Sequence, residues 1–209
     1  GVVFGQGNFY ETLTPTQIGS ISAAAYTQWD QATYEGYLTR FQLPKDKVLK
    51  TFSNGMRTKL GIAVALSHHP KLLILDEATS GLDPVVREDI LDVFWEFVQD
   101  ERHSILMSSH ITSDLEKIAD CITFLHQGKL LFCKPKDELR YQYGVLRCGE
   151  AQFKRLDSSE ILVYRKEPCQ IDVLVADKEA ARRRHPDMVV DDATIDDIRL
   201  LYVKGERVK

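Results

Sequence analysis

The chain of 209 residues has the composition of a folded globular protein, with 44% hydrophobic and 28% charged residues. Its 27 basic and 31 acidic side chains give a formal net charge of −4, which excludes a generally basic, polyanion-binding protein, so we expect no nucleic-acid partner. The apolar runs are far shorter than the ~20 residues of a membrane span, and we expect no transmembrane helix. Four cysteines without CxxC spacing indicate free thiols in a reducing compartment.

The first seventy residues predict one short strand followed by helices. Residues 1–4 are apolar and strand-like, and Gly5-Gln6-Gly7-Asn8 interrupts them as a loop. From Pro15 to about Pro70 the apolar residues follow helical spacing; Leu38, for example, follows Tyr34 by four residues. We expect Tyr34 to pack in the core of this helical region.

Alternating strand and helix patterns begin at Lys71. Continuous apolar residues predict strands buried on both faces at Leu72–Leu75 and Ile105–Met107. Helical spacing predicts a helix at Val86–Val98. A shorter helix is predicted at Ser113–Ile118, with Ser113 as its cap. Strands that alternate with helices indicate an α/β fold with a largely parallel sheet.

The remainder of the chain has a different pattern. Cys121–Phe132 predicts a hairpin that turns at Gln127-Gly128. Beyond about Tyr143 we expect a strand pair, Ile161–Tyr164 with Ile171–Val175, and a closing helix at Thr194–Val203. The run Arg182-Arg183-Arg184 is interpreted as a solvated face, with contact to an anionic lipid or nucleotide as the alternative.

The most informative stretch is the strand Leu72–Leu75 with the acidic residues that follow it. Asp76 and Glu77 would lie at the carboxyl edge of a parallel sheet, where α/β proteins bind ligands. Asp76 suits a hydrated Mg²⁺, which prefers one or two carboxylates together with phosphate oxygens. Glu77 suits the orientation and deprotonation of a water that attacks a terminal phosphate. The alternative is a solvated acidic pair at a strand end.

Two further segments stand before and after this pair. Ser53-Asn54-Gly55-Met56 lies 23 residues before Asp76 and opens a helix, whose N-terminus favours phosphate. Ser108-Ser109-His110 follows the next strand, with His110 34 residues after Asp76. His110 would reach the same sheet edge and donate to a terminal phosphate oxygen; a structural histidine is the alternative.

Together these segments resemble the nucleotide-binding subunit of an ATP-binding cassette (ABC) transporter, most of all the bacterial export type with separately encoded membrane subunits. In this resemblance Ser53 to Met56 correspond to the signature motif and Asp76 to the Walker B aspartate. Glu77 corresponds to the catalytic carboxylate, Asp83 to the D-loop and His110 to the switch histidine.

The resemblance implies a P-loop NTPase-like α/β fold that binds ATP and Mg²⁺. It divides the chain into an ATPase domain at residues 1–145 and a small α+β extension at 146–209, with a helical subdomain near 9–68 and a catalytic lobe near 69–140. The implied partners are transmembrane permease subunits and a second ABC ATPase subunit, identical or different. The implied location is cytoplasmic and peripheral, on the inner face of the cell membrane.

Three positions depart from the usual motifs of the family. Asn54 replaces the first glycine of the signature, and asparagine tolerates left-handed backbone better than other non-glycine residues. Met56 replaces a glutamine, which removes a polar contact but keeps the backbone donors. Gln6 lies near the position of the Q-loop glutamine, one residue out of register.

No G-x-x-x-x-G-K-[ST] sequence occurs in the chain, so nothing in it matches a Walker A loop. We expect the chain to lack the first lobe of the family, to be marginally stable by itself, and to be an inactive part of an ATPase. The alternative function is a non-catalytic or regulatory partner that supplies only the signature half-site. A third and weaker alternative is an ABC ATPase that does not serve transport. Such proteins have a long coiled-coil insertion or a tandem second cassette, and the sequence contains neither.

Overall fold

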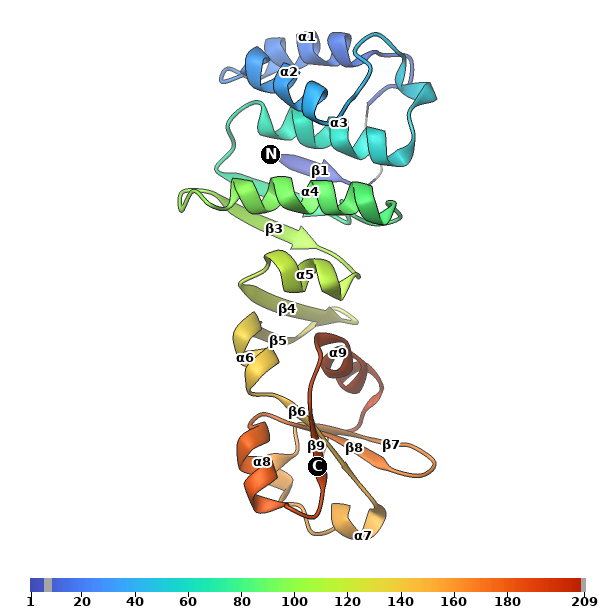
Figure 1. Cartoon of the computed structure of the whole chain (residues 1–209), viewed down its shortest axis with the longest axis vertical. Helices are drawn as coiled ribbons and strands as arrows, with labels where there is room; N and C mark the ends of the chain where they lie inside the picture. The colour runs from blue at the N-terminus through green and yellow to red at the C-terminus, as the bar shows by residue number, and fades with distance from the viewer. Residues whose placement is uncertain (6–8, 208–209) are drawn as a thin grey trace. The chain divides into compact units, whose positions relative to one another are not determined.

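The computed structural model describes residues 1–5 and 9–207. They form two compact units, unit 1 at Gly1–Ile118 and unit 2 at Ala119–Lys209 (Figure 1). The division between the units falls after Ile118 in the chain. The family domain boundary expected between residues 145 and 146 stays a prediction.

A parallel sheet organises unit 1. Its strands are β1 (Val2–Phe4), β2 (Leu72–Asp76) and β3 (Ser104–Ser108), in the order β1-β2-β3. The register places Val2 opposite Ile74, and Ile74 opposite Leu106. Parallel neighbours need long crossover connections, and helices supply them here. The expected α/β class with a parallel sheet is confirmed.

Polar side chains cap several helices of unit 1. They are α1 (Pro15–Ala25), α2 (Gln31–Arg40), α3 (Asn54–Leu66), α4 (Pro84–Phe97) and α5 (Thr112–Ile118), with a 3₁₀ turn, η1, at Leu49–Thr51. Thr14, Asp30 and Ser53 accept hydrogen bonds from the first turns of α1, α2 and α3. Such caps satisfy backbone N–H groups that have no partner inside the helix. The short helix begins at Thr112, so the predicted cap Ser113 is wrong: it lies inside α5.

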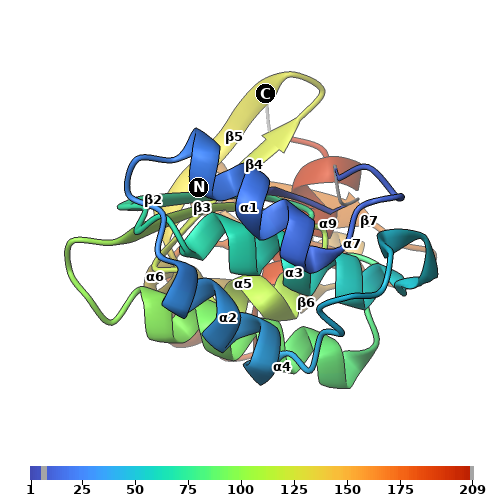
Figure 2. The ribbon, with the colours of Figure 1, turned by 90° about the horizontal axis from the view of Figure 1, so that it is seen from above.

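One face of the sheet forms the core of unit 1 with the helices. Figure 2 shows α3 and α4 on the same side of β2 and β3. Val3, Leu73 and Leu75 point to that side and are buried. In the helical region Tyr34 is fully buried, as expected, and burial raises the pKa of its hydroxyl group. Its hydroxyl donates to the carbonyl oxygen of Pro15 at 2.9 Å, which ties α2 to the start of α1.

The opposite face of the same sheet is apolar and exposed. Leu72 is 46% exposed, Leu106 63%, and Val2, Phe4 and Ile74 are also exposed. The prediction that β2 and β3 are buried on both faces is therefore wrong for the described residues. Successive side chains of a strand point to opposite faces, and the described helices cover only one of them.

Unit 2 contains a hairpin and a separate antiparallel sheet. The hairpin joins β4 (Cys121–His126) to β5 (Lys129–Pro135), and its turn residues Gln127 and Gly128 have φ of 47° and 72°. Two positive φ values are the geometry of a tight hairpin turn, as the Gln-Gly pair predicted. The helix α6 (Lys136–Tyr141) follows.

The sheet of unit 2 has the strand order β7-β8-β6-β9. The strands are β6 (Gly144–Cys148), β7 (Val163–Lys166), β8 (Ile171–Val175) and β9 (Val189–Asp192), joined by α7 (Glu150–Phe153), η2 (Ser158–Glu160) and α8 (Lys178–Arg184), with α9 (Ile195–Lys204) last. The predicted strand pair is confirmed as β7–β8 and the predicted closing helix as α9, which Thr194 caps. The sequence analysis missed β6 and β9, which are short and complete the sheet.

The arginine run in α8 holds unit 2 together. Arg182 donates to the carbonyl oxygen of Val190 and pairs with Asp192 at 2.9 Å. Arg184 pairs with Glu160 at 2.6 Å. All three arginines of the run are exposed, as expected of a solvated face, and Arg182 and Arg184 also form ion pairs within unit 2.

The buried hydroxyl of Tyr34 gives a test of the helical core. We expect Tyr34→Phe to lower the free energy of unfolding of unit 1 by about 1 kcal/mol, because one buried hydrogen bond is lost without a large change of volume. Urea unfolding followed by tryptophan fluorescence measures this, since Trp29 and Trp95, the two tryptophans of the chain, both lie in unit 1. Tyr10→Phe is the matched control, as Tyr10 is 82% exposed. Equal stabilities of the two variants would contradict the assigned core.

Candidate functional site

The candidate site lies where β2 and β3 end. Asp76 is the last residue of β2 and Ser108 the last of β3, and the parallel register sets them side by side. The Ser108 hydroxyl donates to Oδ1 of Asp76 at 2.6 Å. This contact fixes the Asp76 carboxylate at the carboxyl edge of the sheet, which is the edge where parallel α/β sheets bind ligands.

The next residue, Glu77, leaves the strand through a left-handed backbone conformation. Its φ is 51°, which is strained for a residue other than glycine. The Glu77 N–H donates to the backbone oxygen and the hydroxyl of Ser108, at 3.2 and 3.1 Å, and these bonds hold the turn. Backbone strain at an acidic residue in a candidate site is a feature that functional sites often retain.

The Glu77 carboxylate meets the imidazole of His110. Oε2 of Glu77 lies 2.7 Å from Nδ1 of His110, and because an ionised carboxylate only accepts, Nδ1 is the donor. Both side chains are substantially exposed, 40% for Glu77 and 62% for His110, so a ligand can reach them. The structure therefore brings Asp76, Glu77 and His110 to one edge of the sheet, as expected.

Ser108 is the residue that the sequence analysis did not select for this site. It bonds the Asp76 carboxylate and the Glu77 backbone at the same time. The only sequence signal for it is its position at the end of the second strand, and the pairing register is needed to see what it faces.

Asp83 stands at the start of α4. Its Oδ1 accepts from the N–H of Val85 at 2.9 Å, so Asp83 caps that helix. The loop before it turns at Gly81, whose φ of 66° glycine adopts without steric cost. A binding role for Asp83 stays a prediction.

The segment Ser53–Met56 forms the first turn of α3. Ser53 is the cap, and its hydroxyl oxygen accepts from the N–H of Met56 at 3.3 Å. Asn54 is helical, so the tolerance of left-handed backbone expected to matter there is not needed. A Cβ on Gly55 would lie 3.1 Å from a methyl group of Val86, so a larger residue there would make Val86 shift and loosen the packing of α3 against the start of α4.

The helix α3 is oriented so that this first turn points toward the candidate site. Gly61 faces Val3 and Ala65 faces Gly1, so α3 runs antiparallel to β1. The N-terminus of α3 therefore lies toward the end of the sheet where β1 finishes. Ser53–Met56 remain on a separate element from the two acids and His110, and Gln6 lies outside the described residues.

The carboxylate oxygens at the sheet edge fit a hard cation whose remaining ligands are water or phosphate oxygens. Carboxylate oxygens from Asp76 and Glu77 are the ligands that Mg²⁺ prefers, and Mg²⁺ keeps several waters or phosphate oxygens. Within residues 1–5 and 9–207 no group of three or more His, Cys, Asp or Glu is placed to hold a metal. The carboxylate oxygens at the edge fit Mg²⁺ that keeps waters or phosphate oxygens as its other ligands.

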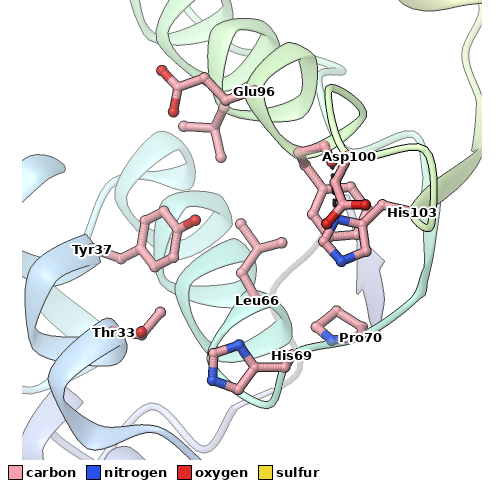
Figure 3. Close-up of a pocket in the computed structure, with 10 residues that line it drawn as sticks. Thr33, Tyr37, Leu66, His69, Pro70, Glu96, Asp100 and His103 are labelled. Carbon is pink, nitrogen blue, oxygen red and sulfur yellow. Dashed lines mark hydrogen bonds between the residues drawn. The ribbon is translucent and has the colours of Figure 1, made fainter.

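A cavity of about 280 Å³ lies elsewhere in unit 1. Figure 3 shows Tyr37, Leu66 and His69 among the side chains around it, between α2 and the C-terminal ends of α3 and α4. Pro70 and His103, which precede β2 and β3, also line it. The cavity is therefore at the opposite end of the strands from Asp76 and Glu77.

Among the helices of the described residues, none combines the length and hydropathy that a membrane span requires.

Comparisons with known proteins agree with this geometry. Residues 1–80 match the family model described as ABC transporter. The chain is 30% identical over 138 residues to the ABC transporter ATP-binding protein YtrB of Bacillus subtilis, covering 66% of this chain and 47% of that protein. It is 45% identical over 89 residues to the lantibiotic transport ATP-binding protein SrtF of Streptococcus pyogenes, covering 43% of this chain and 38% of SrtF.

A further relative is the bacitracin transport ATP-binding protein BcrA of Bacillus licheniformis, 43% identical over 94 residues, or 45% of this chain and 31% of BcrA. A solved structure described as the ATP binding subunit of an ABC transporter matches with a TM-score of 0.55 and 28% identity, over 66% of this chain and 60% of that one. The chain spans less than half the length of these curated relatives. The structural match confirms the expected P-loop NTPase-like fold.

The strained backbone of Glu77 gives a test of the site geometry that needs no ligand. We expect Glu77→Gly to be more stable than Glu77→Ala by about 1 kcal/mol, because glycine adopts a positive φ without steric cost. The free energies of unfolding from urea titration measure the difference.

The matched control uses Glu88, an exposed residue inside α4. There we expect the opposite order, with Glu88→Gly about 1 kcal/mol less stable than Glu88→Ala, since glycine disfavours a helix interior. The same order at both positions would rule out the left-handed turn at Glu77.

Proposed function

We propose that this chain, whose residues 1–80 belong to the ABC transporter family, is part of an ATP-hydrolysing subunit that powers export through separate membrane subunits. The observation that carries the proposal is the pair of contacts at one sheet edge, Ser108 with Asp76 and His110 with Glu77. They hold Asp76, which we propose binds the metal, beside Glu77, which we propose accepts the proton. Relatives named for lantibiotic and bacitracin transport support a transport role.

Asp76 would hold Mg²⁺ together with the phosphates of ATP. Bound Mg²⁺ neutralises the charge that develops on transferred phosphoryl groups. The Ser108 hydroxyl keeps the Asp76 carboxylate in place by donating to Oδ1, and Oδ2 would be the oxygen that binds the metal. The second carboxylate, Glu77, accepts a proton from the attacking water.

His110 would orient Glu77 and contact the terminal phosphate. Its Nδ1 donates to Glu77 at 2.7 Å, so Nε2 would donate to a phosphate oxygen from the protonated imidazolium, in which both ring nitrogens carry a proton. A hydrogen bond to a charged phosphate group contributes more than one between neutral groups. The exposure of both side chains supports access by a nucleotide.

The first turn of α3 would contact the ATP held by a second subunit, identical or different. A helix N-terminus carries N–H groups and a partial positive charge that favour phosphate. The Ser53 hydroxyl accepts from Met56, and its own O–H can donate to a phosphate oxygen. In this arrangement two subunits face head to tail, and closure around ATP would be transmitted to permease subunits at the inner face of the membrane.

The α- and β-phosphates need a loop that these 209 residues do not supply, since no G-x-x-x-x-G-K-[ST] sequence occurs among them. We propose that the active protein binds these phosphates with a Walker A loop outside the chain. The exposed apolar face of β1–β3 supports this, because a further element packed on it would bury Leu72, Ile74 and Leu106.

The role of Glu77 is tested in the protein that also carries a Walker A loop. We expect Glu77→Gln to reduce phosphate release from ATP by at least about 100-fold while ATP binding persists, because the amide cannot accept the proton. Steady-state phosphate release and nucleotide binding measure the two effects. Glu101→Gln is the control, since Glu101 precedes β3 at the opposite end of the sheet and should leave the rate unchanged. Wild-type turnover by Glu77→Gln would remove Glu77 from this role.

Residues 1–209 alone are expected to release no phosphate from ATP above the background rate. The physical reason is that the remaining groups would bind only the terminal phosphate and its metal. The measurement is the same phosphate-release assay, with the Walker A-containing protein as positive control. Turnover by the 209 residues alone would show that no Walker A loop is required.

The second candidate, a non-catalytic partner that supplies only the signature half-site, is favoured by the missing Walker A sequence. It predicts that Ser53→Ala lowers the turnover of a mixed dimer whereas Glu77→Gln does not. Thr14→Ala removes another helix cap and serves as the control for lost stability. Loss of turnover with Glu77→Gln would exclude this candidate.

A further inference from the structure

Two cysteines that are twelve residues apart in the sequence meet on the hairpin of unit 2. Cys121 begins β4 and Cys133 lies in β5, and their Sγ atoms are 3.5 Å apart. The register pairs Thr123 with Cys133 and Cys121 with Pro135, so the two cysteines are diagonal neighbours on one face of the hairpin. Both are exposed free thiols.

The surroundings make the two thiols unequal. The hydroxyl of Thr123 donates to the sulfur of Cys133 at 3.2 Å. This hydrogen bond, followed by that of Cys121, lowers the pKa of the Cys133 thiol. The contact with Cys133 raises the pKa of Cys121. Cys133 is therefore the better nucleophile of the pair, and Cys121 is placed to react second.

We propose that Cys121 and Cys133 form a peroxide-sensitive thiol pair that closes to an intramolecular disulfide. The Cys133 thiolate attacks one oxygen of a hydroperoxide, the O–O bond breaks, and Cys133 becomes a sulfenic acid while the departing oxygen takes a proton. The Cys121 sulfur then attacks the Cys133 sulfur, the S–O bond breaks, and the released hydroxide takes the Cys121 proton as water. Two thiols lose two electrons, and hydrogen peroxide is reduced to two waters.

The geometry favours a reversible bond over a permanent one. Diagonal neighbours in an antiparallel pair have Cα atoms about 7–8 Å apart. Ordinary disulfides join Cα atoms within about 4.4–6.8 Å, so closure requires the strands to shift. The register irregularity between Phe124 and Leu125, next to Thr123, interrupts the ladder where this shift is needed. Strained and exposed disulfides are the readily reduced ones.

The other two cysteines lack these features. Cys148 is buried, and burial raises the pKa of its thiol. Cys169 is exposed, but it lies in the connection between β7 and β8 and not on the hairpin. These two residues provide internal references for any oxidation experiment.

The test treats the purified chain with hydrogen peroxide and follows free thiols and peptide masses. We expect the count of free thiols to fall from four to two, with one peptide pair linked through Cys121 and Cys133 and recovery of all four on treatment with dithiothreitol. Cys169→Ser should leave this linkage unchanged. A linkage through Cys169, or independent oxidation of single cysteines, would overturn the proposal.

The order of the two steps is tested with single variants. Cys121→Ser should stop the disulfide and leave a sulfenic acid on Cys133 that dimedone traps. Cys133→Ser should slow oxidation at Cys121 by about tenfold or more, because the thiol of lowered pKa is lost. Thr123→Val, which keeps the shape of the side chain without its hydroxyl, should slow the first step several-fold but still permit the linkage. Equal rates at the two cysteines would contradict the assigned order.

Discussion

The hydrogen-bonded register between β2 and β3 is the constraint on which the candidate site depends. It sets Asp76 beside Ser108, and the Ser108 hydroxyl then bonds both the Asp76 carboxylate and the Glu77 backbone. The left-handed turn at Glu77 is held by the same two strands. A shift of one residue would turn Ser108 to the other face of the sheet and release both carboxylates from these contacts.

Among the described residues, helices pack against one face of this sheet and leave the other exposed. Val3, Leu73 and Leu75 are buried against that side, whereas the alternating residues Leu72 and Ile74 remain exposed among the described residues. Gly55 allows α3 to lie close to the start of α4, since a Cβ there would be 3.1 Å from Val86, and Gly61 faces Val3 of β1. The same packing that builds the core thus orients the first turn of α3 toward the end of the sheet that bears the acids.

Much of the site could be predicted because strand ends and helix starts have local signals. The apolar run before Asp76 and the apolar run before Ser108 located both strand ends, and Ser53 marked a helix cap. The exposed face of β2 could not be predicted, because a continuous apolar run is the same whether one face or both are covered. The strands β6 and β9 were missed because it is their pairing, β6 with β8 and β9 with β6, that identifies them as strands.

The sequence by itself determined the α/β class, the alternation of strands and helices over residues 72–118, and the choice of Asp76, Glu77 and His110 as candidates, because periodicity and motif spacing are properties of nearby residues. Tertiary structure decided the role of Ser108, the left-handed turn at Glu77 and the meeting of Cys121 with Cys133. Each of these depends on which atoms of one strand stand opposite those of another. Pairing register joins residues far apart along the chain, and the local pattern of residues does not contain it.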